Sequence, residues 1–167
     1  MLKYLSFDIV FQEVPDEVTL AINISGCPNR CKGCHSPYLM EDIGEALNEE
    51  ALANLLGRYT NAITCVCFMG GDSEPGSVEQ LSLFVRESSN RRLRTAWYSG
   101  KNNLPSGCSP ESFDYIKLGP YVEELGGLDS PVTNQHFYKI EDGKMKDQTE
   151  AFTKKMRQFE FEDVCAV

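Results

Sequence analysis

The order of its apolar segments is the feature that most constrains the fold of this chain. Segments such as "VTLAINI" and "AITCVCFM" alternate or are β-rich, as strands are, whereas "EALNEEALANLLGRY" repeats its apolar residues at helical spacing. Strands are predicted at residues 18–24, 62–69, 93–99 and 113–119, with helices at 45–59 and 77–89. Strands alternating with helices are typical of a parallel α/β sheet.

The two ends of the sequence extend this pattern. Residues 1–14 are interrupted by polar residues and predict a strand rather than a signal peptide. Residues 136–142 predict an edge strand or hairpin, and residues 149–161 a helix. A chain of 167 residues is expected to form a single domain, 1–167, in which residues 141–167 are a C-terminal extension of unassigned role.

The net charge of the chain disfavours some classes of macromolecular partner. Sixteen basic and 25 acidic residues give a formal net charge of −9, which argues against nonspecific binding of nucleic acid or of anionic membranes. No apolar run approaches the roughly 20 residues that cross a bilayer. We therefore expect a cytoplasmic protein with neither nucleic-acid nor membrane partners.

Three of the seven cysteines lie within eight positions, in the spacing C-x3-C-x2-C: Cys27, Cys31 and Cys34. A structural zinc site and an electron-carrying [4Fe–4S] ferredoxin site each need four ligands, and no fourth is obvious here. A cluster held by three thiolates instead leaves one iron open to bind a ligand, as catalytic metal sites do. This third interpretation explains why there are only three thiols.

The other four cysteines are interpreted as buried or incidental thiols. They are Cys65, Cys67, Cys108 and Cys165. The odd total of seven argues against a secreted disulfide scaffold, and clustered thiols in a reducing compartment indicate metal or redox chemistry instead.

Two further motifs follow predicted strands. "GGD" at residues 70–72 ends the second predicted β/α strand, and "YSG" at 98–100 ends the next. In parallel α/β sheets, ligands bind where loops leave the carboxyl ends of strands. The cysteine loop and these two motifs are therefore predicted to lie along one rim.

The motifs together resemble those of the radical S-adenosylmethionine (SAM) enzymes. C-x3-C-x2-C after a strand resembles the cluster signature of that family, "FMGGD" its GGE element with Asp72 in place of Glu, and "AWYSG" its Y-T-G strand end. The resemblance implies a partial (β/α) barrel with a mostly parallel sheet and helices on the outside. It also implies a [4Fe–4S] cluster whose open iron binds SAM, which is cleaved reductively to methionine and a 5′-deoxyadenosyl radical.

One branch of that family is the most similar. Gly33 before the last cysteine, "GPYVEEL" at residues 119–125 and "TNQ" at 133–135 resemble the anaerobic ribonucleoside-triphosphate reductase activating proteins, although Leu118 stands where these carry Asp. The resemblance covers most of residues 1–140. It implies an activase that generates a glycyl radical on a large class III reductase, supplied with electrons by a low-potential donor such as flavodoxin or ferredoxin.

The resemblance also assigns the site residues. Cys27, Cys31 and Cys34 match the cluster ligands. The residues that match SAM-binding positions are Gly33, Cys34, His35, Gly70, Gly71, Asp72 and Ser99. No catalytic residue is expected beyond the cluster and SAM. Two alternatives stay open: another small radical SAM enzyme, such as a formate-lyase-type activase or one acting on a small heterocycle, and a non-enzymatic iron–sulfur or zinc protein.

Overall fold

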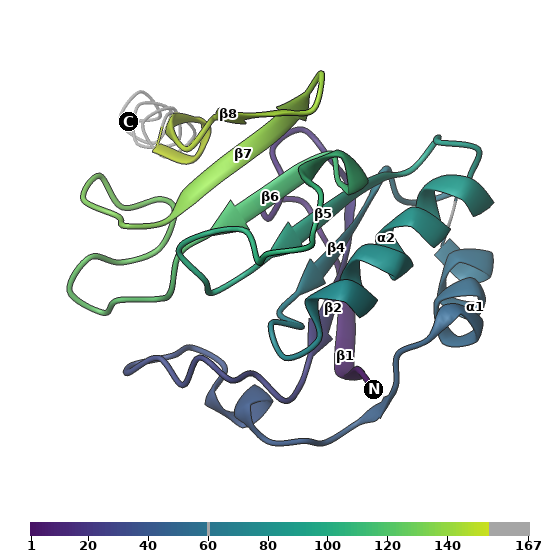
Figure 1. Cartoon of the computed structure of the whole chain (residues 1–167), viewed down its shortest axis with the longest axis horizontal. Helices are drawn as coiled ribbons and strands as arrows, with labels where there is room; N and C mark the ends of the chain where they lie inside the picture. The colour runs from purple at the N-terminus through teal and green to yellow at the C-terminus, as the bar shows by residue number, and fades with distance from the viewer. Residues whose placement is uncertain (60, 154–167) are drawn as a thin grey trace, which may run out of the picture.

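A mixed β-sheet forms the centre of the molecule, which is represented by a computed structural model that describes residues 1–59 and 61–153 (Figure 1). Eight strands are formed by the described residues, in the order β3-β1-β2-β4-β5-β6-β7-β8. The strands are β1 (Lys3–Val10), β2 (Thr19–Ile24), β3 (Glu45–Ala46), β4 (Cys65–Met69), β5 (Arg94–Tyr98), β6 (Tyr115–Leu118), β7 (His136–Glu141) and β8 (Lys144–Asp147).

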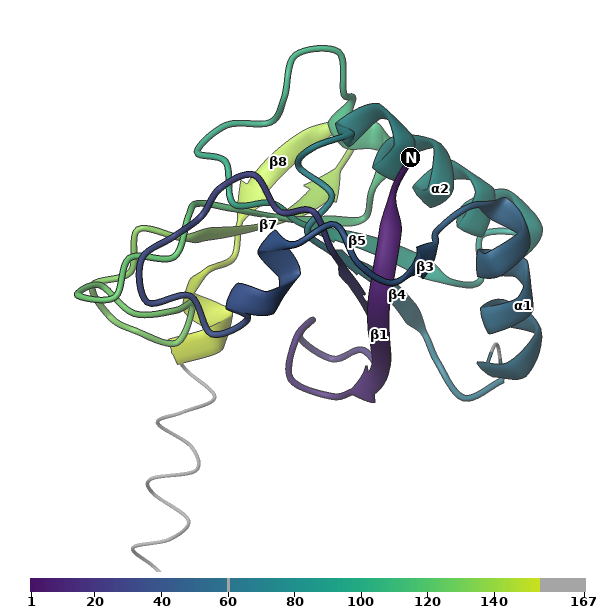
Figure 2. The ribbon, with the colours of Figure 1, turned by 90° about the horizontal axis from the view of Figure 1, so that it is seen from below.

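Two α-helices in the described residues, α1 (Glu49–Tyr59) and α2 (Pro75–Ser88), cover the same face of this sheet (Figures 1 and 2). Two short 3₁₀ helices, η1 (Pro37–Met40) and η2 (Pro110–Ser112), lie in connecting loops. Among the described residues, neither α-helix has the length and apolar content needed to cross a membrane. The helices therefore serve to bury one side of the sheet.

The strands bury apolar side chains on both faces, as β4 illustrates. Val66 and Phe68 pack under α1 and α2, whereas Cys65 and Cys67 point to the opposite face. On that opposite face they meet Val14 and the aromatic rings of β6 and β7. Burial on both faces explains why β4 reads as a continuous apolar run rather than as an alternating one.

The expectation of a mostly parallel partial barrel with helices on the outside is wrong. Only the pairs β2–β4, β4–β5 and β5–β6 are parallel among the described strands. The four other neighbouring pairs are antiparallel: β1–β2, β1–β3, β6–β7 and β7–β8. A (β/α) barrel needs a helix after each strand. Here the connection from β5 to β6 contains only η2, and β6 returns directly to β7 as an antiparallel neighbour.

Most individual elements lie where the sequence predicts them. The four parallel strands and both α-helices are confirmed in order. Helix α1 begins only at Glu49, because residues 45 and 46 pair with β1, and α2 begins at Pro75, which suits a first helical turn. Residues 136–147 form the predicted hairpin. The predicted C-terminal helix is helical over 150–153, and the rest of it, with Cys165, lies outside the described residues.

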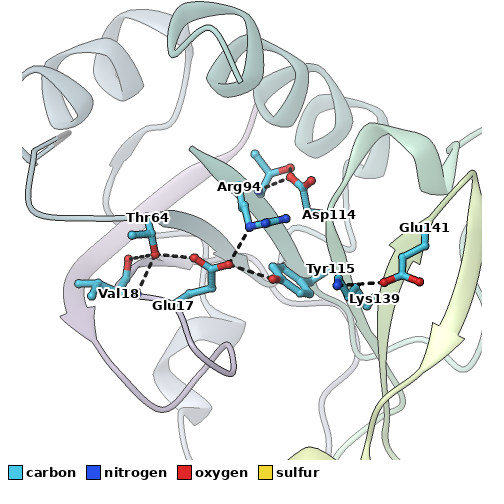
Figure 3. Close-up of polar contacts among 9 residues, drawn as sticks. Glu17, Val18, Thr64, Arg94, Asp114, Tyr115, Lys139 and Glu141 are labelled. Carbon is cyan, nitrogen blue, oxygen red and sulfur yellow. Dashed lines mark hydrogen bonds and ion pairs between the residues drawn. The ribbon is translucent and has the colours of Figure 1, made fainter. Parts of the chain in front are cut away.

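At the amino ends of the parallel strands, the carboxylate of Glu17 ties three elements together (Figure 3). Its oxygens accept hydrogen bonds from the hydroxyls of Thr64 and Tyr115 and form an ion pair with Arg94 at 2.9 Å. Glu17 is only 9% exposed. This amino-terminal edge is a closed polar network that joins the loop before β2 to β5 and β6.

Candidate functional site

The three sequence motifs lie on one edge of the sheet, as predicted. Parallel register aligns a row of residues at the carboxyl ends of the central strands: Asn23, Met69, Tyr98 and Lys117. The chain leaves this row into the cysteine loop after β2, into Gly70-Gly71-Asp72 after β4 and into Ser99-Gly100 after β5. We call this edge the carboxyl-terminal rim. It is where open parallel sheets bind ligands.

The carboxylate of Asp72 joins the three motifs on this rim. The hydroxyl of Ser99 donates to Asp72 Oδ1 at 2.6 Å. The amide nitrogen of Asn29, within the cysteine motif, donates to Oδ2 at 2.5 Å, and the backbone N–H of Gly100 donates to the same oxygen at 2.8 Å. Asp72 and Ser99 are both buried. Hydrogen bonds to a buried charged acceptor are strong, so this hub fixes the cysteine loop against the ends of β4 and β5.

Asn29 is a residue of the site that the sequence did not reveal. It matches no need of a metal ligand, and the motif defines only the cysteines around it. Its importance comes from Asp72, 43 positions away in the chain. A Cβ on Gly100 would collide with the amide of Asn29, which explains the glycine at this position.

The glycines of the "GGD" turn have a structural reason of their own. Both have φ in the left-handed range, +104° at Gly70 and +87° at Gly71, which favours glycine. A Cβ on Gly71 would lie 2.5 Å from Cγ2 of Val78 in α2. The carbonyl of Gly70 accepts a hydrogen bond from the buried indole of Trp97 at 2.8 Å. The turn is therefore packed tightly onto the core.

The three clustered cysteines are half-buried on a single loop and carry no disulfide. The amide N–H of Ser36 donates to the sulfur of Cys34 at 3.4 Å. Among the described residues, no group of three or more His, Cys, Asp or Glu side chains is gathered closely enough to hold a metal ion. The donors thus share a loop but are not drawn together around a common centre.

The two cysteines of β4 differ from the three loop cysteines in burial and in the pKa of their thiols, and both properties affect metal binding. Cys65 and Cys67 are fully buried, and burial raises the pKa of both thiols well above its usual value. The thiolate is the form that binds metals. As predicted, Cys65 and Cys67 are core residues. The half-buried thiols among the described residues are the three of the loop and the isolated Cys108, which lies between β5 and η2. Soft thiolate ligands suit iron–sulfur clusters and zinc, so the donor set of the loop fits either.

The loop between β6 and β7 forms a second wall beside the cysteine loop (Figure 2). The rings of His35 and Tyr121 lie 4.7 Å apart, centre to centre. A Cβ on Gly33 would lie 3.0 Å from the carboxyl group of Glu123. Residues 121–123 therefore contact the same loop positions that were predicted to surround SAM.

The "TNQ" motif holds this second wall in place. The side-chain amides of Asn134 and Gln135 both donate to the carbonyl of Pro120, at 3.0 and 3.4 Å. Gly119 packs so closely against these two residues that a Cβ there would lie 3.0 Å from the Asn134 carbonyl oxygen and from Gln135 Cα. The motif therefore acts on the turn at residues 119–121, and through it on Tyr121.

Lys117 adds a buried positive charge at the rim. Its ammonium donates to the carbonyl of Gly119 at 2.7 Å. Burial lowers the pKa of Lys117 to about 8, and electrostatic interactions with Asp72 and Cys31 act in the opposite direction. The side chain therefore lies within electrostatic reach of the cysteine motif and of the Asp72 hub.

Comparisons of the chain with protein-family models, with curated proteins and with solved structures found no match.

Proposed function

We propose that this chain is a radical SAM activase that generates a glycyl radical on an anaerobic, class III ribonucleoside-triphosphate reductase. The observation that carries the proposal is the hydrogen bond from Asn29 to Asp72. It joins the C-x3-C-x2-C motif to the "GGD" turn, and Ser99 joins the third motif to the same carboxylate. Three segments that resemble one family's motifs thus share one buried hub.

Cys27, Cys31 and Cys34 would hold a [4Fe–4S] cluster, and the rim formed by Gly70, Gly71 and Ser99 would bind SAM next to it. When bound, the two groups supply reductive cleavage of SAM and, from it, hydrogen abstraction by a radical. A cluster would bring the sulfurs of this one loop to a common centre. The Asp72 hub would anchor the loop at Asn29, between the first two cysteines.

The remaining groups of the rim would orient the cofactor. The ammonium of Lys117 is the buried cation among the described residues, and it would stabilise a carboxylate such as that of the methionine moiety of SAM. His35 and Tyr121 would form the wall that excludes water on the side of the second loop. No general acid or base is required, because a hydrogen atom rather than a proton leaves the substrate.

The test is anaerobic reconstitution of the full chain with iron and sulfide, followed by reduction and addition of SAM with and without a candidate reductase. The expected result is 5′-deoxyadenosine together with a glycyl radical signal on the reductase. Flavodoxin or ferredoxin is the expected electron donor, and the cytoplasm the expected compartment.

The other outcomes separate the alternatives. Deoxyadenosine without a glycyl radical would indicate another small radical SAM enzyme, such as a formate-lyase-type activase or one that acts on a small heterocycle. A well-filled cluster that yields no deoxyadenosine would overturn the proposal and indicate a non-enzymatic iron–sulfur protein. Stoichiometric zinc in place of iron would indicate a zinc site.

A further inference from the structure

Four of the chain's seven arginines line one hollow on the side of the molecule away from the carboxyl-terminal rim. The hollow has a volume of about 250 Å³ and lies where α2 ends and β5 begins. Its lining residues are Arg86, Arg91, Arg92, Leu93, Arg94 and Asp114. We call it the arginine hollow. The proposed activase chemistry makes no use of it.

The charges of the arginine hollow are poorly neutralised. Only Arg94 has a carboxylate partner, Glu17, among the described residues (Figure 3). Arg86 donates to the backbone carbonyl of Glu111 at 2.5 Å, and Arg92 to that of Ser89 at 3.2 Å. No hydrogen bond or ion pair is formed by the side chain of Arg91 in the described part of the chain. Four arginines therefore line one hollow in a chain whose net charge is −9, and only one of them is paired with a carboxylate among the described residues.

The single acidic residue of the hollow does not compensate for them. The carboxylate of Asp114 accepts a hydrogen bond from the backbone N–H of Thr95 at 2.8 Å, and a longer one from the Thr95 hydroxyl (Figure 3). Asp114 thus stabilises the start of β5 through these hydrogen bonds. Because like charges repel one another, four arginines around one hollow favour the binding of an anion there.

The backbone at the hollow is also unfavourable. Asn90 and Arg91 follow α2 with φ of +49° and +57°, and the amide of Arg91 donates to the carbonyl of Arg86 at 2.7 Å. Such left-handed residues commonly end helices, and glycine adopts the conformation most easily. Asparagine is tolerated there, but arginine is not favoured. The chain therefore places a charged side chain where glycine would be more stable.

We propose that the arginine hollow binds a phosphoanion: a short chain of phosphate groups, either free or carried by a nucleotide. Guanidinium groups form paired hydrogen bonds with phosphate oxygens, and a bound anion would remove the repulsion among the four arginines. Pockets that enclose whole drug-sized ligands measure about 300–1,000 Å³, so the smaller hollow suits the phosphates rather than an entire nucleotide.

The test is calorimetric titration of the full-length chain with inorganic triphosphate and with ATP, both at the same ionic strength because salt screens exposed charges. We expect saturable binding of one ligand per chain. Equal affinities would show that only the phosphates are recognised, and tighter binding of ATP would identify a nucleotide as the source. Absence of saturable binding of either ligand would overturn the proposal.

Arg91→Gly provides the sharpest variant. It removes a guanidinium and also relieves the left-handed backbone, so we expect triphosphate affinity to fall about tenfold while the Tm of the free protein stays equal or rises. If Arg91 had a purely structural role, its replacement would lower the Tm instead. Arg92→Gln should weaken binding to a similar degree, and it keeps the test decisive if the first variant folds poorly.

Arg30→Gly is the matched control. Arg30 is also exposed and also has positive φ, +47°, but it lies at the opposite rim in the cysteine loop. Its replacement should leave triphosphate affinity unchanged. An equal loss of affinity in Arg30→Gly and Arg91→Gly would mean that only net charge matters, and would overturn the assignment of a site. Arg91→Gly should retain SAM cleavage, so failure of this proposal and failure of the activase proposal are distinguishable.

Discussion

The buried charged groups at the two edges of the parallel strands have different kinds of partner. At the amino-terminal edge, Glu17 is paired directly with Arg94. At the carboxyl-terminal rim, Asp72 accepts hydrogen bonds from neutral groups, and Lys117 donates to a backbone carbonyl rather than to a carboxylate. The two charges of an ion pair stabilise the fold and neutralise each other. A charge that is hydrogen-bonded only to neutral groups is not neutralised and can still attract a ligand of opposite charge. The difference supports the rim as the place of the proposed activase chemistry, whereas Glu17 and its partners stabilise the fold at the opposite edge.

Replacement of a rim cysteine should have the largest effect. Cys31→Ala removes one of three thiolates, so we expect almost complete loss of iron after reconstitution and no SAM cleavage. Cys65→Ala, on the buried face of β4, should retain both, because that thiol is inaccessible. Iron content per chain and deoxyadenosine yield are the measurements. A fully loaded, active Cys31→Ala variant would contradict the assignment of the cluster to the rim.

Loss of the Asp72 carboxylate should have the next largest effect. In Asp72→Ala, three buried or half-buried donors lose their acceptor. We expect the free energy of unfolding to fall by about 3–5 kcal/mol, since each hydrogen bond to a charged group contributes roughly 1.5–3 kcal/mol and the losses overlap. Chemical denaturation measures this change.

The control for this variant is Asp42→Ala. Asp42 forms an ion pair with Lys3, but its side chain is 76% exposed, so its loss should cost about 1 kcal/mol or less. If Asp72→Ala were no more destabilising than Asp42→Ala, the hub would not hold the three motifs together.

Glu17→Gln tests the amino-terminal edge. The variant removes the charge that Arg94 faces and weakens the hydrogen bonds from Thr64 and Tyr115. We expect a loss of about 2–3 kcal/mol of stability, of the size found for hydrogen bonds to charged groups, with SAM cleavage per folded chain unchanged. Denaturation and the deoxyadenosine assay on the same preparation separate the two effects. Cleavage that fell without a loss of stability would mean that the edges are not independent.

The rim was more predictable from the sequence than the sheet that supports it. Apolar periodicity locates β2, β4, β5 and β6, and parallel strands necessarily end on one edge. The pairing direction of the outer strands is not encoded locally. The segment 1–14 predicts a strand, but only the contact of β1 with β2 and β3 makes this side of the sheet antiparallel. This is why the expected partial barrel was wrong.

Some of the individual site residues could be predicted from the sequence, and others could not. The cysteines and glycines stand out because their types and spacing are unusual. Asn29 does not stand out, because no sequence pattern marks an amide between two cysteines. Its role depends on Asp72, which only the fold brings next to it. Gly71 matches a SAM-binding position, and its Cβ position faces Val78 in the core. A sequence motif can thus single out a residue without deciding whether the residue binds a ligand or packs in the core.

Lys117 gives the smallest predicted effect and the most direct measure of the unpaired charge at the rim. Its pKa is lowered from 10.5 to about 8 in the folded chain, so between these values the unfolded chain binds the proton that the folded chain has lost. Stability must then rise with pH across this window. Relative to Lys117→Met, the cluster-free wild type should gain about 2 kcal/mol in free energy of unfolding between about pH 7 and about pH 9.5. Other titrating groups are common to both proteins and cancel in the difference. A difference that stays flat over this range would mean that the ammonium is as well stabilised as in water, and the contrast between the two edges would lose its electrostatic basis.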